Sequence, residues 1–109
     1  MLNERFAIYN KLGGDSMINY DSAEKIVSDR LVGIGGGDLA ITHTDEYEFG
    51  WIFSYNSKRF LETNNLSYAI AGNAPLIVDK NDGQLYVTGT AHGLDYYITQ
   101  YRKGIRNHA

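Results

Sequence analysis

The histidines and acidic residues are the side chains of this 109-residue sequence best suited to acid–base or metal chemistry. His43, His92 and His108 are scattered, without the short spacing that brings two imidazoles to one metal ion. The sequence has no cysteine, no HExxH motif and no G-x-S-x-G motif. We therefore predict no catalytic residue, no metal site and no cofactor, although a cleft in which titratable groups converge would still indicate an enzyme.

Two glycine-containing stretches resemble ligand-binding loops but lack a required residue. In the run Gly33–Gly37, Asp38 occupies the place of the third glycine of a G-x-G-x-x-G phosphate loop, and the run follows a predicted helix instead of leading into one. The run Asp79–Gly83 resembles part of a calcium loop, but its glycine comes one position early and no glutamate closes the loop. We predict that both stretches are turns.

The densest group of like charges is the acidic run Asp45, Glu46 and Glu48. Such a run usually marks a solvated turn, and Asp45-Glu46 falls between two predicted strands. Carboxylates grouped in this way can also dock on the basic surface of a protein partner. We predict a turn here and keep these three residues as candidate partner contacts.

Aromatic residues recur with period two at Phe49, Trp51, Phe53 and Tyr55. This alternation predicts a strand with one aromatic face. The face is most simply part of the core, and alternatively it is an exposed stripe that recognises another protein. Trp51 and Tyr55 are therefore the aromatic candidates for partner contact.

Length, charge and hydropathy limit the class of protein. A chain of 109 residues suffices for one small domain but not for two. Its net charge of −3 argues against nucleic-acid binding, which requires a basic face. No segment approaches the roughly 18 apolar residues of a membrane span, and the N-terminus shows no apolar signal region. Together with the absence of cysteine, these features predict a cytoplasmic protein.

The hydrophobic pattern predicts two helices and two hairpins. Residues 21–32 form an amphipathic helix that begins at a capping box of Asp21 and Glu24 and stops at Gly33. Residues 94–103 form a second helix with one apolar face. Strands are expected at residues 39–44, 49–55, 76–78 and 84–88, the last two joined by the turn Asn81-Asp82-Gly83.

This order of elements predicts an α+β fold, with a small antiparallel sheet of about four strands and the N-terminal and C-terminal helices packed on one face. Residues 57–68 fit either a strand or a helical turn, and residues 104–109 are expected to fray. Residues 1–16 are interpreted as an N-terminal extension of uncertain role, and residues 17–109 as a single domain. Exposed sheet edges leave a homodimer open.

Several short motifs occur together from Gly50 onward. They are Gly50-Trp51-Ile52-Phe53, Phe60-Leu61, Ala71-Gly72-Asn73-Ala74-Pro75-Leu76-Ile77-Val78-Asp79-Lys80, Asp82-Gly83 and Gly89-Thr90-Ala91, followed by a helix that contains Tyr96-Tyr97. In this combination the chain resembles the immunity protein 35 family, also called the YrhB domain, over about residues 17–103. It departs from the family pattern in residues 1–16 and in the long glycine run of residues 33–37.

The motif residues are expected to hold the backbone in place more than to touch a partner. Gly72 and Asn73 are residue types that tolerate a left-handed backbone, and Pro75 fixes its own φ. Gly83 and Gly89 suit turns. The residues assigned a structural role in this way are Gly50, Gly72, Asn73, Pro75, Asp79, Gly83, Gly89 and Thr90.

The resemblance also implies a function. It implies an immunity protein, encoded beside a bacterial polymorphic toxin, that binds the toxin domain and blocks it. An acidic inhibitor would suit a basic toxin such as a nuclease, while a papain-like or deaminase toxin is equally open. The alternative is a chaperone-like module that binds unfolded chains weakly through exposed aromatic residues such as Trp51 or Tyr55.

Overall fold

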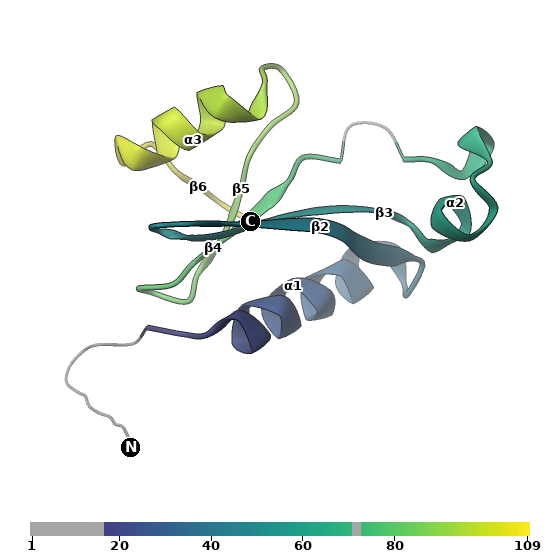
Figure 1. Ribbon diagram of the computed structural model, residues 1–109, viewed down its shortest axis with the longest axis horizontal. Coiled ribbons are helices and arrows are strands. Elements are labelled where there is room, and N and C mark those ends of the chain that lie inside the picture. The colour runs from purple at the N-terminus through teal and green to yellow at the C-terminus, as the bar shows by residue number, and fades with distance from the viewer. Residues whose placement is uncertain (1–16, 71–72) are drawn as a thin grey trace.

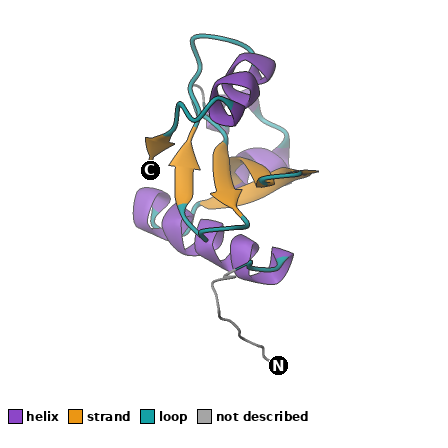
Figure 2. Cartoon of the chain, turned by 90° about the vertical axis from the view of Figure 1, so that its left-hand side faces the viewer, coloured by secondary structure: helices purple, strands orange, loops and turns teal. Residues whose placement is uncertain are grey.

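The computed structural model describes residues 17–70 and 73–109, so the predicted extension 1–16 and the motif residue Gly72 lie outside it. The described chain contains one five-stranded antiparallel sheet, ordered β2-β3-β4-β5-β6, with helices around it (Figures 1 and 2). The elements are α1 (Tyr20–Gly35), β2 (Leu39–Tyr47), β3 (Gly50–Ser57), α2 (Lys58–Thr63), the 3₁₀ helix η1 (Leu66–Tyr68), β4 (Leu76–Asp79), β5 (Leu85–Val87), α3 (Leu94–Arg102) and β6 (Asn107–His108). The predicted α+β class is confirmed.

The helices α1 and α3 lie on opposite faces of the sheet, which corrects the prediction that both pack on one face (Figure 1). Successive side chains of a strand point to opposite faces, so Phe53 turns toward α1 while Ile52 turns toward α3. The core under α1 consists of Ala23, Val27, Leu31, Leu39, Trp51, Phe53, Leu76 and Val78. The core under α3 consists of Phe49, Ile52, Ile77, Tyr86, Ile98 and Tyr101.

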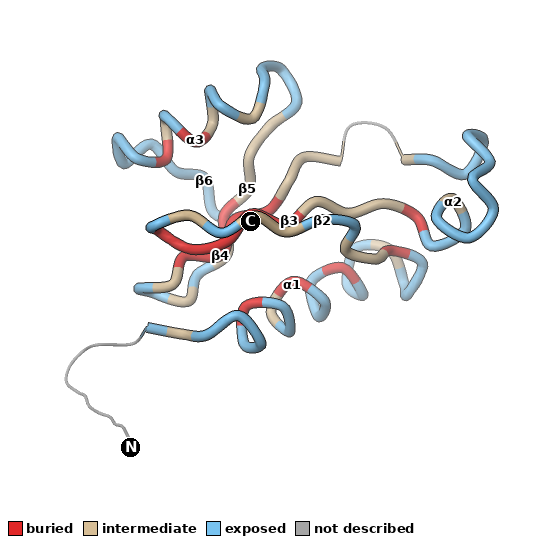
Figure 3. Tube along the Cα trace, in the orientation of Figure 1, coloured by how far each residue is buried: buried red, intermediate tan, exposed pale blue. Residues whose placement is uncertain are grey.

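The central strands are therefore buried from both sides. All four residues of β4 are buried, and so are Gly50 to Phe53 of β3 (Figure 3). Full burial of one large apolar side chain contributes about 1.5–3 kcal/mol relative to exposure. The two strands thus supply apolar surface to both cores, and neither helix could be moved to the other face without exposing one of them.

The helix α1 begins and ends at different residues from those predicted. Asn19, and not Asp21, is the N-cap, because its side-chain oxygen accepts a hydrogen bond of 2.9 Å from the backbone N–H of Ser22. The helix continues through Gly33, the predicted stop, as far as Gly35. It ends where Gly36 adopts the left-handed conformation with φ +61°.

Both predicted hairpins are present, with one change in the first. β2 pairs with β3 from Leu39 opposite Ser57 to Tyr47 opposite Gly50, and the turn between them consists of Glu48 and Phe49. Asp45 and Glu46, predicted as the turn, are instead residues of β2. Their polarity was misleading because β2 is an edge strand, where polar side chains reach water.

The two segments that the sequence left open or expected to fray are ordered. Ser57 accepts a hydrogen bond of 3.3 Å from the N–H of Phe60, which begins α2. At the other end of the chain, β6 pairs with β5 through Val87 opposite Asn107 and Tyr86 opposite His108. The prediction of a frayed tail at residues 104–109 was wrong, and β6 supplies the fifth strand.

A buried carboxylate, Asp79, ties β4 to α3 and to the segment that follows it. Asp79 is 2% exposed, and its Oδ2 accepts a hydrogen bond of 2.5 Å from the Tyr101 hydroxyl. The Arg106 guanidinium lies 3.5 Å from the same oxygen and stacks over the Tyr101 ring at 3.9 Å. The other carboxylate oxygen accepts from the N–H of Asn81 at 2.8 Å. These partners offset the cost of burying the charge.

Replacement of Gly50 by alanine should lower the stability of the fold strongly. Gly50 has φ +151°, and an added Cβ would lie 2.0 Å from the carbonyl oxygen of Val78 on the neighbouring strand. We expect Gly50→Ala to lower the free energy of unfolding by about 3 kcal/mol or more in urea denaturation. The control Gly33→Ala meets no atom within 4 Å in α1 and should raise stability by about 0.5 kcal/mol. Equal stabilities of the two variants would contradict the close approach.

The buried hydroxyl of Tyr101 predicts a loss of stability at alkaline pH. Burial first, and the hydrogen bond to Asp79 second, raise the pKa of Tyr101 well above its ordinary value of 10.0. This stabilisation is complete below pH 10 and is lost as the pH rises above that value, by up to about 1.4 kcal/mol per pH unit. Tyr101→Phe should be less stable than wild type at pH 7 and lose stability less steeply between pH 10 and 11.5. Equal slopes for the two proteins would refute this role of Tyr101.

Candidate partner-binding site

The three candidate acidic residues occupy the end of the β2–β3 hairpin but do not form one surface. Glu46 lies opposite Trp51 in the pairing of β2 with β3 and shares its face of the sheet, the α1 side. Asp45 lies opposite Ile52 and belongs to the α3 side. Glu48 stands in the turn and reaches Arg102 of α3. The alternation of β2 therefore divides the run between the two faces.

Each of these carboxylates has a basic partner nearby. Glu46 lies 3.2 Å from the Nζ of Lys80, and Asp45 lies 3.0 Å from the Nε2 of His43. Glu48 accepts two hydrogen bonds from Arg102, of 2.7 and 2.9 Å. Glu46 and Glu48 thus pair with cations and Asp45 with an imidazole, so the acidic run is not a bare negative patch.

The Glu48–Arg102 pair has the strongest electrostatic signature of the hairpin. The hydrogen bonds from Arg102 are the main cause that lowers the pKa of Glu48 to about 2. The same hydrogen bonds raise the pKa of Arg102. Both side chains are about half exposed or more, so water screens the pair and its contribution to stability is small. A basic group of a partner would have to compete with Arg102 for Glu48.

The aromatic candidates differ in their accessibility. Trp51 is 6% exposed and belongs to the core under α1, with the Lys80 ammonium 5.2 Å above its ring. Because it is almost fully buried, it offers a partner little surface, although it contributes to the lining of one shallow hollow. Tyr55 is half-buried at the edge of the same core. The aromatic stripe predicted from period two is therefore mainly core, and Phe49 at its start belongs to the other core.

Tyr20 is one of the accessible aromatic residues of the described chain that the sequence analysis did not select. Its ring stacks on Phe53 at 6.0 Å and meets Trp51 edge-on at 6.2 Å, while 38% of the residue remains exposed. With Thr44, Glu46 and Trp51 it lines a shallow hollow of about 320 Å³. The signal available in the sequence was Asn19, a residue type that favours the N-cap position, placed directly before Tyr20.

The motif residues near the chain segment 73–75 hold loops against the sheet. The Asn73 side-chain amide donates a hydrogen bond to the backbone carbonyl of Tyr55. The Pro75 carbonyl accepts from both the N–H and the hydroxyl of Thr88, at 3.1 and 2.8 Å. These contacts fix the entry to β4 at the point where the chain leaves the undescribed residues 71–72.

Gly83, Gly89 and Thr90 lie in the loops that connect the last elements of the chain. Gly83 has φ +68° in the β4–β5 turn. An added Cβ on Gly89 would lie 2.5 Å from the Tyr97 hydroxyl, so the loop before α3 passes close to that ring. Thr90 is exposed in the same loop. The geometry thus gives Gly83 and Gly89 a conformational role and shows no contact that explains Thr90.

Within residues 17–70 and 73–109, no three His, Asp or Glu side chains gather as ligands for a metal ion. His43 pairs with Asp45 on the exposed strand β2, and His92 stacks on Tyr96 at 4.0 Å in the loop before α3. The helices of this part of the chain also lack the combination of length and hydropathy that a bilayer span requires.

Comparisons with known proteins agree with the motifs. A relative from Escherichia coli (strain K12), described as "Uncharacterized protein YrhB", is 38% identical over 63 residues, which are 58% of this chain and 67% of the relative. No solved structure matches the chain. The model of the family described as Immunity protein 35 matches residues 21–98, which run from α1 into α3. The chain therefore belongs to the Immunity protein 35 family.

Proposed function

We propose that the protein is an immunity protein that binds a bacterial polymorphic toxin domain, encoded by a neighbouring gene, and blocks it by direct contact in the cytoplasm. Membership of the Immunity protein 35 family is the observation that carries this proposal. In this function the protein needs no catalytic step, so it acts as an inhibitor and not as an enzyme.

The proposed contact surface is the α1 side of the β2–β3 hairpin. Glu46 offers a carboxylate whose side chain is 66% exposed, while its partner Lys80 is only 17% exposed. The adjacent hollow presents the Tyr20 ring, and Tyr55 lies further along the same face of β3. Asp45 and Glu48 add charge around the rim on the other side. Charges at a rim act mainly on the association rate and on specificity, which suits an inhibitor that must find one partner quickly.

A net charge of −3 favours encounter with a basic toxin. The attraction is long-ranged only at low ionic strength, since the Debye length is about 8 Å at physiological salt. Direct contact with Glu46 would persist at higher salt because it does not depend on long-range steering. The salt dependence of binding therefore separates these two contributions.

Charge reversal at Glu46 should weaken a complex with the product of the adjacent gene. We expect wild-type protein to form a selective complex with this toxin, and Glu46→Lys to slow association and weaken binding by about tenfold. The matched control is Asp29→Lys, which reverses an equally exposed carboxylate that pairs with Lys25 at 3.1 Å on the outer side of α1. The two variants are compared by surface plasmon resonance at two salt concentrations. Equal affinities would remove the β2–β3 hairpin from the proposed interface.

The second candidate function is a chaperone-like module, for which the structure offers different residues from those predicted. Trp51 is buried, but apolar side chains are between 47% and 79% exposed at the end of α1 and on α2 and η1, which lie at the same end of the molecule (Figure 1). They are Val32, Ile34, Leu61 and Leu66. Exposed apolar side chains grouped in this way mark interaction surfaces.

If this second function applies, added protein should suppress the aggregation of several unrelated heat-denatured proteins, followed by light scattering. The double variant Leu61→Gln with Leu66→Gln should lose most of this effect, because it removes the two most exposed apolar side chains of α2 and η1. Met17→Gln is the control, since Met17 is 66% exposed but lies away from these elements. Failure of the wild-type protein to suppress aggregation, with a selective toxin complex, would exclude the chaperone-like function.

A further inference from the structure

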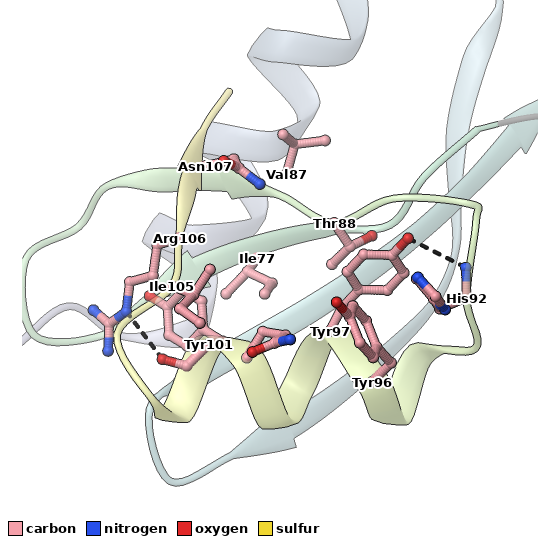
Figure 4. A pocket seen from close by; sticks show the side chains of 11 residues that line it. Ile77, Val87, Thr88, His92, Tyr96, Tyr97, Tyr101, Ile105, Arg106 and Asn107 are labelled. Atoms are coloured by element: carbon pink, nitrogen blue, oxygen red, sulfur yellow. Dashed lines mark hydrogen bonds between the residues drawn. The ribbon is translucent and has the colours of Figure 1, made fainter.

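A pocket of about 250 Å³ lies on the α3 side of the sheet, on the face opposite α1 (Figure 4). It is bounded by β5, the loop before α3, the inner side of α3 and residues 105–107. Ile77 and Tyr101, each 2% exposed, belong to both the pocket lining and the core. Cofactor and drug-sized ligands occupy about 300–1,000 Å³. The size of this pocket therefore suits one large side chain better than a cofactor.

One end of the pocket is an aromatic wall. The His92 ring stacks on Tyr96 with 4.0 Å between centroids, and Tyr97 meets Tyr96 edge-on at 5.2 Å. The Tyr97 hydroxyl accepts hydrogen bonds from the backbone N–H groups of Ala91 and His92, at 3.1 and 3.3 Å (Figure 4). The wall is thus held in place before any ligand arrives, which lowers the entropic cost of stacking another ring on it.

Two side-chain amides in the lining are available for hydrogen bonds. Gln100 and Asn107 line the pocket, and neither side chain has a hydrogen-bond partner within the described part of the chain. A purely apolar occupant would displace water from these amides without replacing its hydrogen bonds. The pocket therefore favours an occupant that combines a flat apolar body with a polar edge.

The charges around the pocket argue against a cationic occupant. No carboxylate of the described residues belongs to the lining, and Arg106 contributes a guanidinium at the end away from the aromatic wall (Figure 4). The nearby carboxylate of Asp79 already accepts from Tyr101 and pairs with Arg106. An arginine or lysine side chain would enter without a counter-charge, next to a positive group.

We propose that this pocket receives a neutral aromatic side chain with a hydrogen-bonding edge, a tyrosine or tryptophan, from the partner protein. The inference rests on the proposed function, in which that partner is the toxin, and it gives the toxin a second contact, separate from the one on the α1 side of the β2–β3 hairpin. The ring stacks between the aromatic wall and Ile105, and its polar edge bonds to Gln100 or Asn107. Tyrosine and tryptophan anchors that fill preformed pockets are the residues that most often dominate protein interfaces.

The pocket can be tested without the toxin by NMR titration with N-acetyl-tyrosinamide. We expect saturable shifts of the Gln100 and Asn107 side-chain amide signals, with affinity about three- to tenfold higher than for N-acetyl-phenylalaninamide or N-acetyl-argininamide. Gln100→Leu should reduce the affinity by a similar factor. The control Gln84→Leu makes the same change at an exposed site before β5 and should have no effect. Absence of saturable shifts, or equal binding of the arginine compound, would overturn the proposal.

A second measurement with the toxin separates this inference from the proposed function. Tyr96→Ala removes the exposed ring of the aromatic wall, and we expect it to weaken the toxin complex by about tenfold or more. An unchanged affinity would overturn the role of the pocket while leaving the immunity function intact. If wild-type protein forms no complex with the toxin, the proposed function fails, and the tyrosinamide titration alone decides whether the pocket accepts an aromatic ring.

Discussion

The pairing of β3 with β4 supplies both hydrophobic cores with one short stretch of antiparallel sheet. Four residue pairs, from Gly50 opposite Asp79 to Phe53 opposite Leu76, form this contact. Because side chains alternate along each strand, six of these eight residues supply the cores: Trp51, Phe53, Leu76 and Val78 lie under α1, and Ile52 and Ile77 lie under α3. At the end of the pairing the strands approach so closely that only glycine fits at position 50. The strands β2, β5 and β6 extend the sheet on either side of this pair, and α1 and α3 cover its two faces.

The polar contacts of the structure serve mainly to hold the outer elements onto that centre. Asp79 reaches α3 through Tyr101 and the following segment through Arg106. Glu48 reaches α3 from the opposite side through Arg102, and Glu46 reaches the segment after β4 through Lys80. The buried Asp79 contacts matter more for stability than the exposed pairs, since water screens the latter. This difference leaves the exposed carboxylates able to exchange their partners.

The sequence predicted the elements better than their arrangement. The period-two pattern around Trp51 and the turn Asn81-Asp82-Gly83 identified both hairpins, because each signal is local in the chain. The placement of α1 and α3 on opposite faces was missed. The apolar run Leu76-Ile77-Val78 is compatible both with a strand covered on one face and with a strand covered on two, so it could not distinguish them. The strand β6 was missed because residues 107–108 carry no apolar pattern and pair through their backbone. Of the candidate site, the face on which each acidic residue lies could not be predicted, because it depended on a strand boundary three residues beyond the predicted one.

The division of the interior into two cores by a single sheet has a consequence for how such a protein can change over evolutionary time. The backbone of the sheet separates the side chains under α1 from those under α3, so substitutions in one core should combine almost additively with those in the other. The residues on one face can then maintain the fold while the residues on the other face change in sequence as the partner changes. A protein whose binding partner changes rapidly would benefit from this separation. Substitutions that alter its specificity on one face would leave the packing of the other core unchanged.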